Sequence, residues 1–374
     1  GKPNLPNDQA TKGMIMTRQV QVPKADVASG QVVDLGYSSL ADGAVRLAIE
    51  SFSVTANNVT YAVVGDGFGY WNFFPAPEGM GIVPMWGHAR VIESHCPDIA
   101  VGERVYGYLP MASHLDVVPG RVSAGGFLDT TDYRQPMSPV YNSYTRLAAD
   151  PEHDPAREAE RMIFGPLFRT GFLIEYFLRA QDWFGAEQLI VTSASSKTAL
   201  GLASVARQSS PGIRRIGLTS RGNVGFVTAT GLYDEVVAYD DLERVPVLRS
   251  VSVDFAGNAD LLAQVHRHFD AALAHSALVG MTHIEARSTF GGAEPLPGPK
   301  PALFFAPDHA VAFFKAHGPE EGGKLVAAAW HEFLKAADGT VAIERHKGLE
   351  AARTVFSAMV AGQIDPAMGV VIEP

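Results

Sequence analysis

The spacing of hydrophobic residues changes near residue 151. Between residues 20 and 118, short valine-rich runs such as 59–64 are separated by Gly, Pro, Asn and Asp. This pattern is typical of β-strands joined by tight turns. After Pro151 the apolar segments become longer, and residues 167–184 have an apolar majority with few helix breakers. The pattern predicts a β-rich first part and a domain boundary between residues 155 and 156.

The second part alternates short apolar runs with segments of helical periodicity. Such alternation is typical of a parallel sheet covered by helices. A helix is expected over 259–274, and a loop rich in Gly and Pro follows at 291–301. The sequence therefore predicts an α/β fold with a doubly wound parallel sheet. The expected strands are 189–191, 213–220, 251–255 and 277–281, and the expected terminal helices are 308–315, 323–337 and 349–361.

Small and hydroxyl-bearing residues fill the turn after the first of these strands. A dinucleotide-binding turn normally carries Gly-x-Gly-x-x-Gly, and here the three glycine positions are filled by Ala194, Ser196 and Ala199. The turn is either the diphosphate site of a nucleotide-binding sheet or an ordinary strand-to-helix connection with a solvated lysine. The side chains able to bind phosphate oxygens directly are Ser195, Ser196, Lys197 and Thr198.

The end of the second strand favours a phosphorylated dinucleotide. A site for NAD normally has Asp or Glu there, whereas a site for NADP needs cations and hydroxyl groups around the 2′-phosphate. The chain has no Asp or Glu between Gln188 and Tyr233. The sequence predicts NADP(H) as the cofactor, with Arg221 as its main contact. The polar residues at the strand end are Thr219, Ser220, Arg221 and Asn223, and the arginines of the window are Arg207, Arg214, Arg215 and Arg221.

Composition narrows the class of protein. The 374 residues are 47% hydrophobic, which is enough for a sizeable core in two domains. A net charge of −10, with no concentrated basic stripe, argues against a nucleic-acid partner and favours small molecules. The sequence shows neither a bilayer-spanning apolar run nor a signal-peptide pattern, so no membrane partner is expected. A single cysteine, Cys96, indicates a reducing compartment, and we expect the cytoplasm.

The order of these parts resembles that of the medium-chain dehydrogenase/reductase superfamily. Residues 101–107, Val-Gly-Glu-Arg-Val-Tyr-Gly, are similar to its Val-Gly-Asp-Arg-Val-x-Gly strand. Residues 231–239 are similar to its Gly-Ala-Asp-x-Val-Ile-Asp-Tyr segment. Residues 253–258 resemble its fourth Rossmann strand, and residues 369–372 resemble its closing strand.

The resemblance implies two domains but says little about the substrate. A GroES-like β-rich domain would occupy residues 15–155 and be completed by about 310–374, and a Rossmann domain would occupy 156–309. The resemblance also implies a homodimer, in which two chains pair through the edges of their Rossmann sheets. Three segments are similar to a branch that carries only an unknown-function label, and a shared fold does not define a reaction. These segments are 57–62, 70–75 and 193–199.

The sequence lacks the metal ligands of zinc-dependent members of the superfamily. Those members use a catalytic Cys, the His of Gly-His-Glu and a second Cys or Asp. Trp86-Gly87-His88-Ala89 keeps only the histidine, and one cysteine cannot supply the thiolates. We expect no metal and interpret His88 as packed or hydrogen-bonded, although 12 histidines leave a scattered His/Asp site open. The metal-free branches instead reduce an electron-poor C=C bond with hydride from the nicotinamide.

Three tyrosines are candidate catalytic groups. In enoyl-thioester reductases, a Tyr that follows Asn-x-x-Asp donates to the substrate carbonyl. Residues 57–60, Asn-Asn-Val-Thr, resemble that segment, and Tyr70 falls near the place of the tyrosine. Tyr61 is the alternative donor, and the aromatic residues beside Tyr70 form either a substrate wall or a core cluster. Tyr141 and its polar neighbours are expected either to bind substrate or cofactor or to form a turn at the domain boundary. Candidate contacts for the nicotinamide half are Gly257, Gly280 and Thr282.

The expected function is zinc-independent, NADPH-dependent reduction of the activated C=C bond of an α,β-unsaturated carbonyl, either an enone or an enoyl thioester. A quinone is the first alternative acceptor. Aromatic residues crowd the first domain, so the substrate of either reaction is expected to be apolar or planar. A further alternative is a protein that binds NADP(H) as a sensor or scaffold without turnover, because the sequence has no unmistakable acid/base pair.

Overall fold

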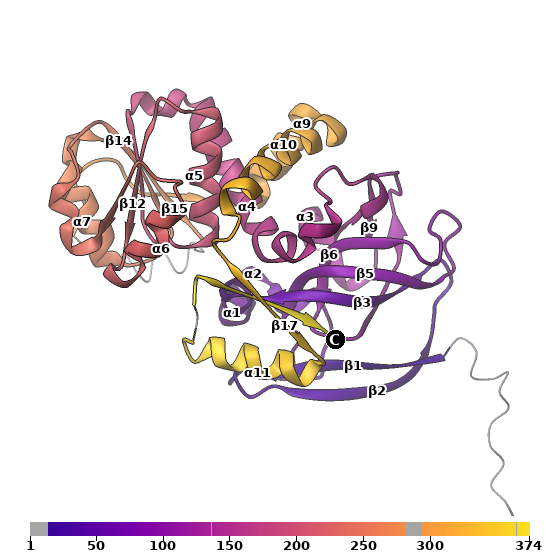
Figure 1. The fold of residues 1–374 in the computed structure, drawn as a ribbon. Helices are drawn as coiled ribbons and strands as arrows, with labels where there is room; N and C mark the ends of the chain where they lie inside the picture. The colour runs from indigo at the N-terminus through magenta and orange to yellow at the C-terminus, as the bar shows by residue number, and fades with distance from the viewer. Residues whose placement is uncertain (1–13, 136, 281–293, 364) are drawn as a thin grey trace, which may run out of the picture. The chain divides into compact units, whose positions relative to one another are not determined.

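The computed structural model describes residues 14–135, 137–280, 294–363 and 365–374. The chain divides into two compact units, Gly1–Ile163 with Ile343–Pro374 and Phe164–Ala342 (Figure 1). These divisions come later than the boundaries at 155/156 and about 310 that the sequence suggests. The second difference arises because the helices between residues 306 and 337 contact each other and helix α5, so they belong to the second unit. The helices concerned are α5 (Lys197–Ser209), α9 (Ala306–His317) and α10 (Pro319–Ala337).

Mainly antiparallel β-strands form the framework of the first unit. A nine-stranded sheet has the order β17-β18-β3-β5-β6-β10-β9-β8, with β7 paired to β3, and a three-stranded sheet has the order β2-β1-β4. The last strand of the chain, β18, pairs with β3, so the C-terminal segment completes this unit. The strands are β1 (Met14–Pro23), β2 (Gln31–Ser39), β3 (Val45–Val54), β4 (Met80–Gly81), β5 (Pro84–Ser94), β6 (Arg104–Pro110), β7 (His114–Val117), β8 (Pro119–Gly120), β9 (Gly126–Asp129), β10 (Ser143–Arg146), β17 (Ala342–Lys347) and β18 (Met368–Glu373).

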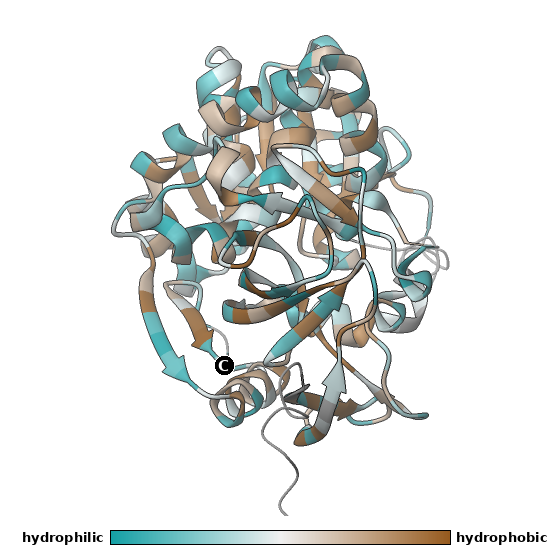
Figure 2. Ribbon diagram, turned by 90° about the vertical axis from the view of Figure 1, so that its right-hand side faces the viewer, coloured by the Kyte–Doolittle hydropathy of each residue, from teal (hydrophilic) through white to brown (hydrophobic). Residues whose placement is uncertain are grey.

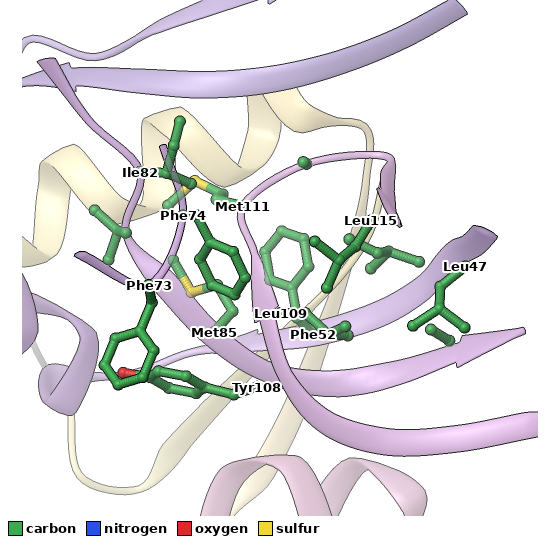
Figure 3. Packing of buried hydrophobic residues seen from close by; sticks show 14 of the residues in the cluster. Leu47, Phe52, Phe73, Phe74, Ile82, Met85, Tyr108, Leu109, Met111 and Leu115 are labelled. Carbon is green, nitrogen blue, oxygen red and sulfur yellow. The ribbon is translucent and has the colours of Figure 1, made fainter. Parts of the chain in front are cut away.

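Aromatic and aliphatic side chains fill the interior of the first unit. Phe52, Phe73 and Tyr108 are completely buried, and Figure 3 shows them close to Met85 and Leu109. The ring centroids of Phe73 and Tyr108 are 4.9 Å apart in an edge-on contact. Each such side chain contributes about 1.5–3 kcal/mol to folding by leaving water. This core supports the strand β5 and the short helices that carry the candidate tyrosines.

Short helices connect the strands of the first unit, and one longer helix covers them. Helix α1 begins after Thr55, whose backbone N–H donates to Asn58 Oδ1 at 2.6 Å. Helix α11 contacts β1, β2 and β3, because Leu349, Ala352 and Phe356 recur at helical spacing and form its buried face. The helices are α1 (Ala56–Val63), α2 (Gly65–Phe68), the 3-10 segment η1 (Tyr70–Asn72), α3 (Pro139–Asn142) and α11 (Leu349–Val360).

A six-stranded parallel sheet forms the centre of the second unit. Its strands are β11 (Gln188–Val191), β12 (Arg214–Thr219), β13 (Glu235–Ala238), β14 (Ser250–Asp254), β15 (Leu273–Val279) and β16 (Ala302–Phe304). The order is β13-β12-β11-β14-β15-β16. Leu189 of β11 pairs with Arg215 of β12 and with Val251 of β14. The connections run outward on either side of β11 and β14, and open parallel sheets bind ligands beyond the carboxyl ends of the strands at such a point.

Helices α4 (Glu158–Ala180), α5, α6 (Val224–Ala229) and α7 (Ala259–Phe269) accompany this sheet, and α4 contains the first boundary between the units. The helix expected over 259–274 ends at residue 269, because Asp270 adopts a positive φ of 46° and β15 begins at residue 273. In Figure 2 the helices carry both hydrophilic and hydrophobic residues, as expected when one face packs on other elements. Among the helices that the structure describes, none combines the length and apolarity that a membrane crossing requires.

Candidate functional site

The turn from β11 to α5 is held by hydrogen bonds to neighbouring segments. Ser193 adopts a left-handed conformation, with φ of 50°, and its N–H donates to the Tyr239 hydroxyl at 3.0 Å. Ala194 is completely buried, and its N–H donates to the Leu218 carbonyl at 3.0 Å. These bonds set the direction in which the chain enters α5, which begins at Lys197.

The first residues of α5 present donors to an anion. The Ser196 hydroxyl accepts from the Ala199 N–H at 3.3 Å, so this predicted phosphate ligand already serves as the helix cap. The N–H group of Thr198 lies in the first turn, where the helix itself offers it no carbonyl. The positive end of the helix dipole adds to the attraction of this turn for a phosphate. The donor set of this turn therefore fits a diphosphate.

Glycines on neighbouring elements replace those that the turn lacks. A Cβ atom added to Gly217 of β12 would lie 3.0 Å from the Cβ of Ala194. One added to Gly171 of α4 would lie 2.5 Å from the backbone nitrogen of Leu202 in α5, a separation that real Cβ atoms essentially never show. The close packing that a glycine-rich turn usually permits is thus provided by glycines of β12 and α4, the elements that pack against the turn and against α5. Gly217, in the middle of a strand, is the sequence signal for this arrangement.

The residues predicted to bind a 2′-phosphate lie at the carboxyl end of β12. Thr219 is buried at the end of the strand, Ser220 is exposed, and Arg221 opens the 3-10 segment η6, which ends at Asn223. The Asn223 side-chain amide donates to Ser195 Oγ at 3.4 Å. The structure therefore brings the predicted contacts after β12 together with the turn after β11.

Two carboxylates lie beside Arg221. The absence of Asp and Glu between Gln188 and Tyr233 in the sequence does not indicate them. Arg221 Nη2 lies 3.3 Å from Asp241 Oδ2 and 3.9 Å from Asp240 Oδ2. Both aspartates lie in the 3-10 segment η7 (Tyr239–Arg244), which follows β13, and β13 is the neighbour of β12. The other arginines of the window also have protein partners. Arg207 donates to the Gly231 carbonyl, Arg214 pairs with Glu235, and Arg215 donates to the Leu232 carbonyl.

A pocket of about 380 Å³ lies at the carboxyl ends of β13 and β14. Gly257 beside it has a φ of 64°, and its N–H donates to Asp254 Oδ2 at 2.9 Å. Asp254 also accepts from the Thr192 hydroxyl at 2.8 Å, and burial raises the pKa of this carboxyl. This link between β14 and the turn after β11 is absent from the sequence prediction. The pocket is lined by Tyr239, Asp240, Ala256, Asn258, Asp260, Leu261 and Gln264.

The two remaining candidates for the nicotinamide half are less informative. Gly280 directly follows β15 and has a φ of 80°, a conformation that favours glycine. Thr282 lies outside the described residues. Their roles stay predictions.

The three candidate tyrosines meet in one aromatic cluster of the first unit. The hydroxyl oxygens of Tyr70 and Tyr141 are 3.3 Å apart, and the ring centroids of Tyr61 and Tyr70 are 4.5 Å apart. The Tyr61 hydroxyl accepts from Asn57 Nδ2 at 2.6 Å and from Trp86 Nε1 at 3.1 Å. Burial raises the pKa of Tyr61 and of Tyr141 above the ordinary value. Both hydroxyls therefore stay protonated at neutral pH and act as hydrogen-bond donors rather than bases.

The segment that resembles Asn-x-x-Asp is divided between different roles. Asn57 bonds to the tyrosine cluster, whereas Asn58 is buried and its side-chain amide donates to the Pro84 carbonyl at 2.9 Å. Thr60, at the position of the family's Asp, donates to the Ala56 carbonyl one turn earlier in the helix at 3.3 Å. Asn57 is thus the residue of this segment whose side chain hydrogen-bonds to a candidate catalytic group.

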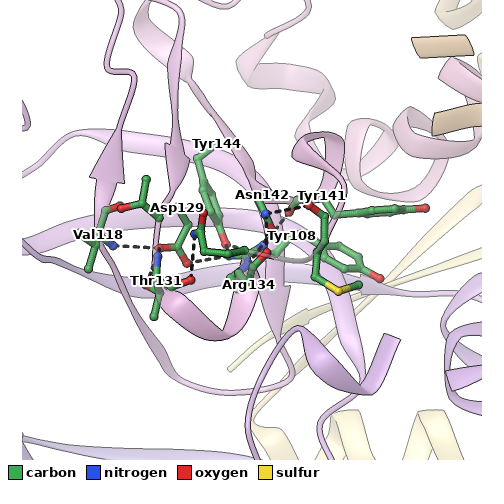
Figure 4. A network of polar contacts seen from close by, with 11 residues as sticks. Tyr108, Val118, Asp129, Thr131, Arg134, Tyr141, Asn142 and Tyr144 are labelled. Atoms are coloured by element: carbon green, nitrogen blue, oxygen red, sulfur yellow. Dashed lines mark hydrogen bonds and ion pairs between the residues drawn. The ribbon is translucent and has the colours of Figure 1, made fainter. Parts of the chain in front are cut away.

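A buried arginine holds the polar segment 141–144, at the end of α3 and the start of β10, in place (Figure 4). Arg134 is 0% exposed, and its guanidinium donates to the Tyr141 carbonyl at 2.6 Å, Asn142 Oδ1 at 3.1 Å and the Tyr144 hydroxyl at 2.6 Å. Asp129 pairs with it at 3.1 Å. The polar side chains of Asn142 and Tyr144 are thus engaged in the structure, while the Tyr141 hydroxyl contacts the tyrosine cluster. Arg134 belongs to no motif, so sequence reasoning gives no signal for its role.

His88 is packed inside the first unit, where its side chain is completely buried. Its ring centroid lies 5.3 Å from that of Tyr106. Burial, with the nearby charges of Arg161 and Arg104, holds the pKa of His88 well below its ordinary value, so the ring is neutral. Within the described part of the chain, neither ring nitrogen has a hydrogen-bond partner.

The two units have the fold of the medium-chain dehydrogenase/reductase superfamily, a GroES-like domain and a Rossmann domain. The chain belongs to a family described as protein of unknown function (DUF2855), whose sequence profile matches residues 52–365. The resemblance to a branch with an unknown-function label is therefore confirmed. No curated protein matches the chain by sequence.

Solved structures of this fold align along nearly the whole chain. The quinone oxidoreductase from Coxiella burnetii is 13% identical, with a TM-score of 0.55 over 96% of this chain and 100% of that chain. The YhdH oxidoreductase from Salmonella enterica, solved in complex with NADP, is 14% identical, with a TM-score of 0.52 over 96% and 99%. CurA from Vibrio vulnificus, solved in complex with NADPH, is 14% identical, with a TM-score of 0.55 over 95% and 98%. Identities this low establish the fold alone, which confirms the predicted fold class.

Proposed function

We propose that this protein is an NADPH-dependent oxidoreductase that reduces the activated C=C bond of an α,β-unsaturated carbonyl without a metal in the reaction. The observation that carries the proposal is the turn from β11 to α5, whose donors fit a diphosphate at the carboxyl edge of a Rossmann sheet. Two of the solved structures with this fold reported above also support the proposal, because they are complexes with NADP or NADPH.

The second unit has residues of the right chemistry for each part of NADP(H). Ser195, Lys197 and the first N–H groups of α5 would hold the diphosphate, and Arg221 would bind the 2′-phosphate. The 380 Å³ pocket between Tyr239 and Asn258 would take the adenosine part. When bound, the reduced nicotinamide supplies a hydride. The roles of the protein are to orient the two reactants and to stabilise the charge that develops on the acceptor.

The tyrosine cluster favours an acceptor that develops negative charge on oxygen. Reduction of an enone or enoyl thioester places negative charge on the carbonyl oxygen, and a protonated hydroxyl stabilises that charge by hydrogen bonding. Tyr70 is the proposed donor, because its hydroxyl lies 3.3 Å from that of Tyr141 and its ring contacts that of Tyr61. In this reduction the hydride adds to the β-carbon of the C=C bond. Protonation of the α-carbon, by Tyr70 or by water, then completes the reaction.

A quinone is the second candidate acceptor. Tyr70, Trp86 and Tyr141 are only partly buried, and the ring centroid of Tyr141 lies 6.2 Å from that of Trp86 and 6.0 Å from that of Tyr70. Such an aromatic surface suits a planar ring, whose two oxygens would accept from the same hydroxyls. A homodimer and a cytoplasmic location are further proposals that rest on the family resemblance and on the single cysteine.

The first test is a fluorescence titration with NADPH and NADH of the wild type, Arg221→Ala and Arg214→Ala. Arg214 is the matched control, because it also forms an exposed ion pair but lies at the opposite end of β12. We expect NADPH to bind more tightly than NADH, and we expect Arg221→Ala alone to weaken NADPH about 10- to 100-fold, since charged hydrogen bonds contribute about 1.5–3 kcal/mol. Absence of binding by either nucleotide would refute the proposal.

The second test measures turnover with enones, enoyl thioesters and quinones in the wild type, Tyr70→Phe and Tyr176→Phe. Loss of a general acid typically lowers the rate at least about 100-fold, so Tyr70→Phe should lower kcat strongly for enone reduction and less for a quinone. Tyr176, which bonds to His317, is the control and should have no effect. Tight NADPH binding without oxidation by any acceptor, and without an effect of Tyr70→Phe, would instead identify a sensor or scaffold.

A further inference from the structure

Three side chains with metal-binding chemistry meet in the first unit, outside the tyrosine cluster. His88 lies on β5, His153 lies in the turn before α4, and Glu158 is the first residue of α4. Each offers one ligand atom, and these atoms all lie within 4.8 Å of one another. The backbone N–H of His153 donates to the Asp150 carbonyl at 3.2 Å, which fixes the turn that carries it.

The buried member of this group lacks a partner. His88 is 0% exposed, and its strand lies between β3 and β6 in the sheet. Among the described residues, no group hydrogen-bonds to either of its ring nitrogens. An unsatisfied buried polar group costs about 1–3 kcal/mol, so native proteins rarely keep one without a ligand, ion or water. Glu158 Oε2 lies 4.0 Å from His88 Nε2, which is too far for a hydrogen bond.

The spacing of these atoms is close to that of ligands around a metal ion. Nitrogen and oxygen ligands lie about 2.0–2.2 Å from zinc, which separates the ligand atoms of a tetrahedral site by roughly 3.4 Å. The most widely separated pair in the group therefore needs to contract by up to about 1.4 Å. His153 and Glu158 are only partly buried, so their side chains have more room to move than that of the completely buried His88.

The arginines around the group are paired with carboxylates, which offset part of their repulsion for a cation. Arg104 Nη2 donates to Glu158 at 2.9 Å, and Arg104 Nε donates to Glu50 at 2.9 Å. Arg161 pairs with Asp150 at 2.8 Å and with Glu152 at 3.5 Å. The local carboxylates therefore exceed these paired arginines in number. The carboxylates are Glu50, Asp150, Glu152 and Glu158, and the arginines, with the exposed partner of Glu50 included, are Arg90, Arg104 and Arg161.

We propose that His88, His153 and Glu158 bind one divalent transition-metal ion, with Zn²⁺ the expected occupant. Two imidazoles and one carboxylate suit Zn²⁺, Co²⁺ or Ni²⁺ and disfavour Mg²⁺ or Ca²⁺, which select oxygen ligands. The set contains no thiolate, so the single cysteine of the chain does not argue against it. By joining β5 to the start of α4, the ion would stabilise this part of the first unit.

The test is metal binding by the full chain, in which neither NADPH nor activity is involved, so its outcome is independent of the proposed reductase function. Protein stripped with a chelator is titrated with Zn²⁺ by calorimetry and with Co²⁺ by visible absorption, for the wild type, His153→Ala, Glu158→Gln and His346→Ala. His346 is the control, because it forms an exposed pair with Glu344 at 2.5 Å and is the rival surface site. Circular dichroism confirms that each variant is folded.

We expect one Zn²⁺ per chain, and visible Co²⁺ bands of a low-coordinate site. His153→Ala and Glu158→Gln should each weaken binding at least about 100-fold, since even outer-shell changes cost about 10- to 100-fold, while His346→Ala should leave it unchanged. Affinity no tighter than millimolar would overturn the proposal, with a water molecule then satisfying His88. Binding that is lost in His346→Ala but not in His153→Ala would also overturn it.

Discussion

Asp241→Asn should tighten the binding of NADPH and leave that of NADH nearly unchanged. The substitution removes one of the two carboxylates beside Arg221 and keeps the size of the side chain. In the wild type, Arg221 Nη2 lies 3.3 Å from Asp241 Oδ2, so a 2′-phosphate must compete with this carboxylate for the same guanidinium. Asp241 also lies 3.8 Å from Arg244, whose charge the substitution would release as well.

The size of the effect follows from two contributions. An exposed ion pair is worth about 0.2–1 kcal/mol, and this is the interaction that the phosphate no longer has to replace. Two unit charges about 4 Å apart in water repel each other by about 1 kcal/mol, and salt reduces this repulsion between carboxylate and phosphate. The sum of about 1–2 kcal/mol corresponds to a tightening of about 5- to 30-fold. The effect should shrink as ionic strength rises.

The assay is the same fluorescence titration with both nucleotides, at low and at physiological salt. Glu235→Gln is the matched control, because Glu235 pairs with Arg214 at the other end of the neighbouring strands and its removal should alter neither affinity. Equal tightening of NADPH and NADH would show that Asp241 acts on a part common to both nucleotides. No change in either would show that the 2′-phosphate is not bound at Arg221, and each result would refute the reasoning.

Two further predictions concern buried groups. Arg134→Met should destabilise the protein by about 3–5 kcal/mol in urea unfolding, because the buried carboxylate of Asp129 loses its counter-charge; Arg18→Met, which breaks an exposed pair, should change stability by less than about 0.5 kcal/mol. His266→Gln should flatten the loss of stability in acid. Burial lowers the pKa of His266 in the folded state, so below about pH 6.5 the unfolded state binds the proton first and the wild type loses up to about 1.4 kcal/mol per pH unit, until the folded state also protonates. Equal slopes for wild type and variant would contradict this.

The sequence predicts elements well where local pattern decides them. Strands β11, β12 and β14 lie within a few residues of the predicted runs, because buried parallel strands are continuously apolar. The predicted helix over 259–274 is too long, since periodicity does not reveal the turn at Asp270. The family resemblance implies that residues from about 310 onward complete the first domain, whereas α9 and α10 lie in the second compact unit. An apolar face shows that a helix needs a partner without showing which one.

The candidate site is predictable in its residue types and not in its long-range partners. Tyr61, Tyr70 and Tyr141 are all named from the sequence, and the structure brings them together. Arg134 has no periodic or motif signal, because its role comes from contacts formed only in the folded chain. The grouping of His88 with His153 is hidden for the same reason, since no short ligand spacing connects residues so far apart in sequence.

The acidic partners of Arg221, in contrast, were within reach of the sequence. In a parallel sheet the carboxyl ends of neighbouring strands meet at one edge, so residues after β13 must lie beside residues after β12. The resemblance of residues 231–239 to a known segment already identifies where β13 ends. Asp240 and Asp241 are the next two residues, and their position beside Arg221 follows from strand order alone. Cofactor preference in such a sheet therefore depends on the ends of two adjacent strands, and a sequence window that ends before β13 omits the two carboxylates beside Arg221.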